Sequence, residues 1–224
     1  MEMLVFGHSG YPLILFSTAK GRYYETKDFG LVGSAEHLLD SGKIKIYCPD
    51  TIDGESWYNY SITPADRVKT YIAYEQMIIY DVIEFAKFET ESKKVGVAGC
   101  SFGGYHALNI AFKHPNLIDT LISMSGTFDI KQFINGYYDD SCYFNNPPDY
   151  LPNLTDPWYV DKIKQMKIIL GTGEWDNTLN ENKQMSNILN AKGIIHHLNI
   201  LQGAGHDWKW WCEMFPHYLS KIVS

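Results

Sequence analysis

The sequence predicts an α/β fold in which helices cover both faces of a mostly parallel central sheet. Short apolar runs of strand length alternate along the chain with longer segments of helical period, as in successive strand, helix, strand units. The chain has 224 residues, 45% of them hydrophobic, which suits one domain with a sizeable core. We therefore expect residues 1–224 to form a single domain.

The N-terminal part is expected to contribute the first strands and a helix. A turn at His8-Ser9-Gly10 precedes the apolar run at residues 13–16, so the first two strands are expected to form an antiparallel hairpin at the sheet edge. Residues 31–41 have helical period and end at Gly42, a residue type that commonly terminates helices. Residues 43–48 form the next expected strand.

A long helix is predicted from the signals at its start. Thr63 is an N-cap residue, Pro64 suits the first helical position, and Asp66 places an acid in the first turn. Apolar residues recur at helical spacing from there towards residue 88. The elements expected next are a short buried strand at 94–98, a helix at 102–114 and a strand at 120–124.

The composition changes between about residues 126 and 162, where prolines are interleaved with tyrosines and a tryptophan. We interpret this segment as an aromatic, proline-rich insertion over the sheet and near the active site, rather than as a second domain. Regular alternation then resumes with a strand at 167–170, a helix at 181–191, a strand at 194–201 and a closing helix from about residue 208.

Charge and apolar patterning exclude several classes of partner. The chain has 19 Lys and Arg against 26 Asp and Glu, a net charge of −7, and lacks the basic run that nucleic-acid binding requires. It has no apolar stretch of about 18 residues that could span a membrane, and its acidic start, Met1-Glu2-Met3, is unlike a signal peptide. The four cysteines are scattered without a CxxC pair, which favours reduced thiols in a cytoplasmic protein.

A nucleophile motif lies between an expected strand and an expected helix. Gly99-Cys100-Ser101-Phe102-Gly103 matches G-x-S-x-G, and strand, turn, helix is the context in which this motif forms a nucleophile elbow. The flanking glycines let the strand and the helix approach closely while the serine hydroxyl stays exposed above the sheet. Ser101 is therefore the predicted nucleophile.

A serine hydroxyl is a poor nucleophile without a base, and His206 is the best candidate for that base. It follows the last expected strand, within Gly205-His206-Asp207-Trp208, at the carboxyl edge of the sheet where Ser101 is also expected. Other histidines have ordinary structural interpretations; His106 and His114, for example, lie on the helix after the serine.

The acid that orients the histidine is expected after the strand at 167–170. The loop there offers Glu174 and Asp176, and the order serine, acid, histidine is the one that α/β-hydrolases use. We favour Asp176, because it lies at the far end of the loop and can reach towards His206; Glu174 remains the alternative. Asp207 is adjacent to His206, so we expect it instead to bond backbone N–H groups of its loop.

Two backbone N–H groups are expected to stabilise the oxyanion of a tetrahedral intermediate. The first belongs to Phe102, the residue after the nucleophile. The second is expected in the loop Ser17-Thr18-Ala19-Lys20-Gly21, where we favour Ala19 over Thr18.

Together these residues resemble the putative-esterase branch of the α/β-hydrolase superfamily, which includes esterase D, feruloyl esterases and mycolyltransferases. The chain departs from that branch at Thr18-Ala19, where a His-Gly or Asp-Gly pair is usual, and it is shorter than typical members. The resemblance rests on Ser17-Thr18-Ala19, Glu55-Ser56-Trp57-Tyr58, residues 99–105, Ser125-Gly126, residues 173–176 and residues 205–208.

The resemblance implies a serine carboxylic-ester hydrolase that acts on a small-molecule ester and needs neither a metal nor an organic cofactor. An acyltransferase to an alcohol or sugar acceptor would use the same triad, and a non-catalytic binding protein of this fold is the third alternative. Whether the chain forms a homo-oligomer is left open. Aromatic side chains expected to contact substrate, unless they only pack their own loops, are Trp57, Tyr58, Tyr143 and Trp175.

Overall fold

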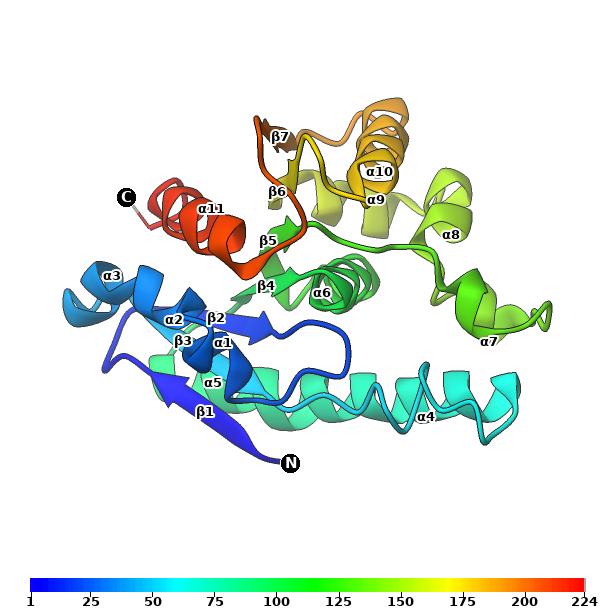
Figure 1. The fold of residues 1–224 in the computed structure, drawn as a ribbon, viewed down its shortest axis with the longest axis horizontal. Coiled ribbons are helices and arrows are strands. Elements are labelled where there is room, and N and C mark those ends of the chain that lie inside the picture. The colour runs from blue at the N-terminus through cyan, green and yellow to red at the C-terminus, as the bar shows by residue number, and fades with distance from the viewer. Residues whose placement is uncertain (224) are drawn as a thin grey trace.

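The computed structural model describes residues 1–223. They form a seven-stranded sheet in the order β1-β3-β2-β4-β5-β6-β7, with β1 antiparallel to β3 and all other neighbours parallel (Figure 1). The predicted α/β class with a mostly parallel sheet is confirmed. The strands are β1 (Met3–Phe6), β2 (Tyr11–Phe16), β3 (Ile44–Pro49), β4 (Val95–Cys100), β5 (Ile118–Met124), β6 (Lys167–Gly173) and β7 (His197–Leu201).

The predicted N-terminal hairpin is wrong. β1 pairs with β3, and β2 lies between β3 and β4, so the first two strands are not neighbours. In β2, every residue from Pro12 to Phe16 is buried, with Leu13 and Leu15 facing one hydrophobic cluster and Ile14 and Phe16 the other. A strand buried on both faces belongs in the interior of a parallel sheet rather than at its edge.

Helices cover both faces of the sheet (Figure 1). Hydrophobic residues of α2, α3 and α11 pack on one face, and those of α4, α6 and α10 pack on the other. The helix predicted at 31–41 is divided at Ala35 into α2 and α3. The helices are α1 (Glu25–Asp28), α2 (Leu31–Ser34), α3 (Glu36–Asp40), α4 (Pro64–Met77), α5 (Glu84–Thr90), α6 (Phe102–Lys113), α7 (Asp140–Tyr143), α8 (Pro147–Asn153), α9 (Pro157–Lys164), α10 (Leu179–Ala191) and α11 (Trp208–Ser220).

The long helix begins at the predicted position. The Thr63 hydroxyl accepts a hydrogen bond from the Asp66 N–H, as an N-cap residue does, and Pro64 is the first helical residue. α4 continues through a π-helical segment, Ile78–Ile83, into α5, so the helical path runs from Pro64 to Thr90. Sequence periodicity did not distinguish the π-helical turn from ordinary helix.

The aromatic insertion begins at the elbow, where the Thr127 N–H donates to the Ser101 carbonyl at 3.3 Å and the Phe133 ring lies 5.2 Å from the Phe102 ring, and its later residues pack on α6. The Tyr105 hydroxyl donates to the Asn145 carbonyl at 2.9 Å, and the Tyr150 hydroxyl donates to Asn109 Oδ1 at 3.2 Å. Beyond these contacts, α7 and α8 border a cavity of about 460 Å³ whose lining includes Phe112 and His114, at the carboxyl end of α6. The insertion therefore extends from the elbow to the carboxyl end of α6.

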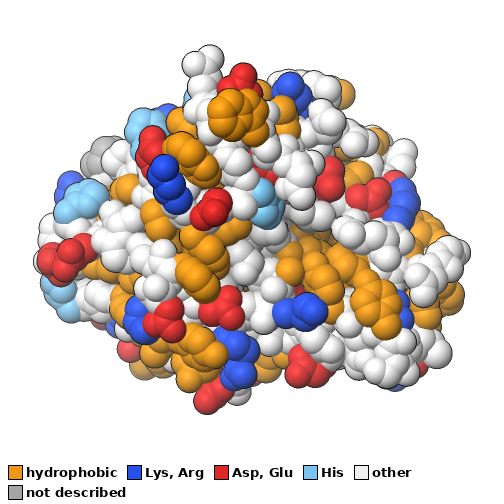
Figure 2. Space-filling view, in the orientation of Figure 1, with side chains coloured by type: hydrophobic (Ala, Val, Ile, Leu, Met, Phe, Trp, Pro, Cys, Tyr) orange, Lys and Arg blue, Asp and Glu red, His pale blue; other side chains and the backbone are white. Residues whose placement is uncertain are grey.

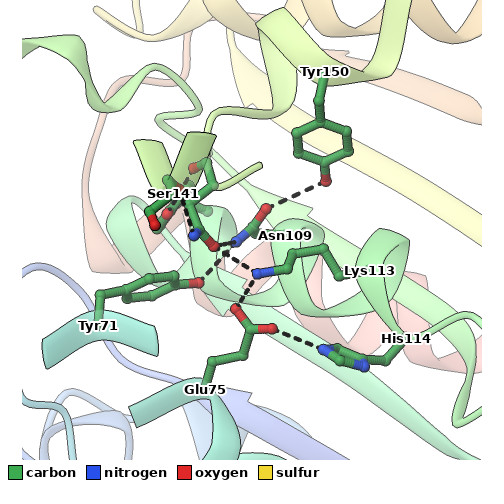
Figure 3. A network of polar contacts seen from close by, with 9 residues as sticks. Tyr71, Glu75, Asn109, Lys113, His114, Ser141 and Tyr150 are labelled. Atoms are coloured by element: carbon green, nitrogen blue, oxygen red, sulfur yellow. Dashed lines mark hydrogen bonds and ion pairs between the residues drawn. The ribbon is translucent and has the colours of Figure 1, made fainter. Parts of the chain in front are cut away.

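A buried carboxylate joins α4 to the end of α6 (Figure 3). Glu75 is 2% exposed; its Oε2 accepts from Lys113 Nζ at 2.6 Å, and its Oε1 lies 2.8 Å from His114 Nε2. Burial alone would raise the pKa of Glu75, but hydrogen bonds from His114 and Lys113 and the Lys113 charge outweigh it and lower that pKa. Lys113 also donates to Asn145 Oδ1 at 2.7 Å, which ties the pair to the insertion.

Replacing Glu75 by glutamine is expected to lower the free energy of unfolding at neutral pH by about 1–3 kcal/mol, because hydrogen bonds to a charged group are lost. The folded-state pKa of Glu75 is lowered, so its contribution is present above the unfolded value of about 4.3 and is lost as pH falls through the folded value. The difference in unfolding free energy between wild type and Glu75→Gln, measured by urea unfolding, should shrink as the pH is lowered through the acidic range. A difference that stays constant would contradict this assignment.

Glu84→Gln is the matched control for that measurement. Glu84 pairs with Lys87 at 2.8 Å on the surface, where its side chain is 48% exposed. Surface pairs contribute about 0–1 kcal/mol, so this variant is expected to stay close to wild type.

Within residues 1–223, none of the helices combines the length and apolar character needed to cross a bilayer. Acidic and basic side chains are interspersed with hydrophobic patches on the face shown in Figure 2. All four cysteines are free thiols.

Candidate active site

Ser101 lies at a sharp turn between β4 and α6. Its backbone has φ 55° and ψ −120°, a left-handed conformation that L-residues rarely adopt, and its N–H donates to the Met124 carbonyl at 2.8 Å. A Cβ on Gly99 would lie 2.1 Å from the Gly103 carbonyl oxygen, so only glycine permits this approach of strand and helix. The predicted strand, elbow and helix context of Ser101 is present.

The His206 imidazole bridges Ser101 and Asp176. His206 Nε2 lies 2.9 Å from Ser101 Oγ, and His206 Nδ1 lies 2.9 Å from Asp176 Oδ1. The three residues follow the carboxyl ends of β4, β6 and β7, which a parallel sheet brings to one edge. The His206 side chain is 27% exposed, whereas that of Asp176 is fully buried.

Asp176 is held by several hydrogen bonds besides that with His206. Its Oδ1 accepts from the Thr178 N–H and the Thr178 hydroxyl, both at 2.8 Å, and its Oδ2 accepts from the Ser125 hydroxyl. Burial alone would raise the pKa of Asp176, but the hydrogen bonds from His206, Ser125 and Thr178 outweigh it and hold that pKa well below the usual value. Asp176 therefore remains ionised.

The two alternative acids have other contacts. Glu174 Oε2 accepts from the Gly203 N–H at 3.0 Å and forms no hydrogen bond with His206 within residues 1–223. Asp207 caps α11, accepting from the Lys209 N–H at 3.1 Å, in agreement with its expected role in fixing the loop. The structure thus places Asp176, rather than either alternative, against His206.

Ser125 and Trp211 support this site, a role that was not predicted for either residue from the sequence. The Trp211 Nε1–H donates to Ser125 Oγ at 2.8 Å, and Ser125 in turn donates to Asp176. The Trp211 ring also meets the His206 ring edge to face, with centroids 5.1 Å apart. Ser125 directly follows β5, next to the elbow, and that position at the carboxyl edge was the available signal.

The two predicted oxyanion donors lie in adjacent segments. Phe102 is the first residue of α6, where backbone N–H groups lack intrahelical partners. The register of β2 and β4 pairs Phe16 with Gly99, and a Cβ on Gly103 would lie 2.0 Å from the Ser17 carbonyl oxygen. The loop that contains Ala19 therefore packs directly on the turn that contains Ser101. Thr18 closes the loop by accepting from the Gly21 N–H at 2.9 Å.

The four aromatic residues expected at the substrate do not gather in one place. Trp57 is 0% exposed and packs in the core against Tyr71, so the expectation that it contacts substrate is wrong. Tyr143 lines the cavity at the carboxyl end of α6, whereas Ser101 precedes the amino end of this helix, about 18 Å away at 1.5 Å per residue. Tyr143 is therefore also misplaced by the sequence prediction.

Tyr58 and Trp175 lie closer to Ser101 and Asp176. The Tyr58 ring meets the Phe102 ring edge to face at a centroid distance of 5.5 Å. Trp175 is 75% exposed and directly precedes Asp176. These two remain candidates for contact with substrate.

Cys100 precedes the serine but is fully buried. Burial raises the pKa of its thiol well above the usual value, with a further contribution from Cys212. The thiol therefore fills space behind the elbow and stays protonated.

Solved structures with this fold include several esterases. An S-formylglutathione hydrolase from Agrobacterium tumefaciens has a TM-score of 0.74 at 12% identity, covering 99% of this chain and 88% of its own. The fluorophosphonate-binding serine hydrolase F of Staphylococcus aureus has a TM-score of 0.69 at 17% identity, covering 99% and 92%. A ferulic acid esterase from Anaeromyces mucronatus has a TM-score of 0.68 at 16% identity, covering 96% and 82%.

Among curated proteins, none matches the chain significantly. The family profile described as "Putative esterase" matches residues 26–222, which is most of the chain. The resemblance inferred from the motifs is thereby confirmed. The chain belongs to this esterase family and is a carboxylic ester hydrolase of the α/β-hydrolase fold.

Proposed function

We propose that the protein hydrolyses small or moderately sized acyl esters through an acyl-Ser101 intermediate. The observation that carries the proposal is the hydrogen-bonded series Ser101, His206, Asp176, with 2.9 Å at each of its two steps, placed at a strained elbow. Ser101 Oγ attacks the ester carbonyl carbon while His206 Nε2 takes its proton. The carbonyl π electrons move to the oxygen and form a tetrahedral oxyanion.

Collapse of that intermediate expels the alcohol. The imidazolium of His206 returns the proton to the leaving oxygen as the C–O bond breaks, which leaves Ser101 acylated. Water then attacks the acyl carbon, giving its proton to His206 Nε2, and the acid is released with Ser101 regenerated. The ionised Asp176 stabilises the imidazolium in both halves of the cycle and keeps Nδ1–H directed towards itself.

The oxyanion is stabilised by the backbone N–H groups of Phe102 and Ala19. Phe102 donates from the first turn of α6, where the positive end of the helix dipole adds to the hydrogen bond. The Ala19 N–H forms no hydrogen bond within residues 1–223, so it is available as the second donor.

Intact mass measurement after exposure to a fluorophosphonate tests this proposal. Ser101 Oγ is expected to bond to phosphorus with loss of fluoride, giving one adduct on wild type that maps to the peptide containing Ser101. Ser101→Ala, labelled in parallel, is expected to show none. Stoichiometric labelling of the variant would contradict the assignment of the nucleophile, and a folded wild type without any adduct would favour a non-catalytic binding protein.

A further inference from the structure

A second histidine and a second aspartate form a buried pair that the proposed reaction does not use. The side chains of His106 and Asp53 are 0% and 1% exposed, and His106 Nε2 lies 2.9 Å from Asp53 Oδ1. A carboxylate only accepts hydrogen bonds, so Nε2 carries the shared proton. The other ring nitrogen, Nδ1, is buried and unpartnered within residues 1–223, so the contact with Asp53 is the one that orients the ring.

The second oxygen of Asp53 holds the loop that contains Ala19. Asp53 Oδ2 accepts from the Lys20 N–H at 2.9 Å, and Lys20 has φ 55°, a left-handed conformation that a lysine rarely adopts. Such a conformation persists only where its surroundings fix it. The bonded N–H belongs to the peptide that follows Ala19, so Asp53 fixes the orientation of the chain one peptide away from the proposed donor.

The ring of His106 packs against a phenylalanine ring from each of the two segments that precede or contain a proposed donor. Its centroid lies 5.8 Å from that of Phe16, the last residue of β2 before the loop, and 5.0 Å from that of Phe102. The backbone of Phe102 carries the other proposed donor. One buried ring therefore spans the two segments whose spacing determines whether both N–H groups can reach the same oxygen.

We propose that Asp53 and His106 are positioning residues that hold the Ala19 and Phe102 N–H groups in register for the oxyanion. Burying a carboxylate is costly unless both its oxygens are paired, and here the two pairings connect α6 to this loop. This inference rests on the proposed function, because it presumes that an oxyanion forms beside Ser101. Neither residue touches the reacting atoms.

A trifluoromethyl ketone measures the oxyanion site directly. Ser101 Oγ bonds to the ketone carbon, His206 takes the serine proton, and the carbonyl electrons pass to the oxygen, so the adduct contains the oxyanion. In Asp53→Ala, kcat/KM for p-nitrophenyl acetate is expected to fall roughly 10- to 100-fold, less than the loss of a donor itself, with the change mainly in kcat. The inhibition constant of the ketone is expected to rise by the same factor.

Asp53→Asn provides the conservative variant. Its carboxamide oxygen can still accept from the Lys20 N–H, so both effects are expected to be smaller than in Asp53→Ala and to remain equal to each other. If Asp53→Ala does not fold, Asp53→Asn alone tests the positioning role: its kcat/KM should fall, and the inhibition constant of the ketone should rise, by the same factor. Equal catalytic constants and equal ketone affinity in wild type and the folded variants would overturn the inference.

Tyr47→Phe is the matched control for stability. It removes a hydrogen bond of 3.0 Å from the Tyr47 hydroxyl to Glu89; Tyr47 lies on β3, which β2 separates from β4 and the elbow. Its melting temperature is expected to fall without a change in ketone affinity. A wild type that forms no ketone adduct would refute the proposed function, whereas an adduct of unchanged affinity in the Asp53 variants would refute only the positioning role.

Discussion

Replacement of Ser101 by alanine is expected to lower kcat/KM for p-nitrophenyl acetate roughly a million-fold, the scale of loss seen when a serine hydrolase loses its nucleophile. Without Oγ the carbonyl carbon has no attacking atom, and only water within the oxyanion site remains. The residues act as a unit, so His206→Ala should cost about as much and the double variant little more. Steady-state rates of the three proteins, with enzyme concentrations verified by intact mass, measure this.

Loss of activity must be separated from loss of structure. Among the described residues 1–223, the Ser101 side chain forms one hydrogen bond, to the partly exposed His206, so Ser101→Ala is expected to melt within a few degrees of wild type. Ser220→Ala, which removes an exposed serine that bonds the His217 carbonyl, serves as the serine control and should retain full activity. A Ser101→Ala protein with activity within tenfold of wild type would show that another residue attacks the ester.

The positions of Ser101, His206 and Asp176 could be predicted because each depends on local pattern plus topology. Each residue follows an apolar run recognisable as a strand, and parallel strands bring their carboxyl ends to one edge. The choice between Asp176 and Glu174 could not be made by spacing alone. It depends on where each side chain turns, and Glu174 turns to the Gly203 backbone.

The errors and omissions have a common cause. The prediction that Trp57 and Tyr143 contact substrate depends on residue type, in segments that lack a helical or strand periodicity. Such segments show neither which side chains are buried nor which residues those side chains contact. The contact of Asp53 with His106 joins residues 53 positions apart. A lone buried histidine gives no periodic signal, so only the structure connects it to the loop it supports.

Replacement of Asp176 by alanine is expected to lower kcat roughly ten-thousand-fold with a small change in KM. The histidine then loses the acceptor that selects its Nδ1–H tautomer and the negative charge that stabilises its protonated form. Ester hydrolysis by the variant, compared with Glu174→Gln, measures this. Glu174 lies two residues away and, as far as residues 1–223 show, forms no hydrogen bond with His206, so its variant is expected to stay within about threefold of wild type. Equal losses in the two variants would mean that Glu174 shares the role.

Asparagine at position 176 is expected to be less damaging than alanine, for a reason specific to this site. Both Thr178 donors and His206 Nδ1 converge on Oδ1, so the amide oxygen is drawn to that position and still accepts from Nδ1–H. The amide nitrogen then faces Ser125 Oγ, a hydroxyl oxygen that can accept. Asp176→Asn would thereby keep the tautomer and lose only the charge, and its kcat is expected between those of wild type and Asp176→Ala. If Asp176→Asn and Asp176→Ala lower kcat equally, the charge on Asp176 contributes the whole effect. If adding Thr178→Val to Asp176→Asn lowers kcat further, Thr178 selects the orientation of the amide.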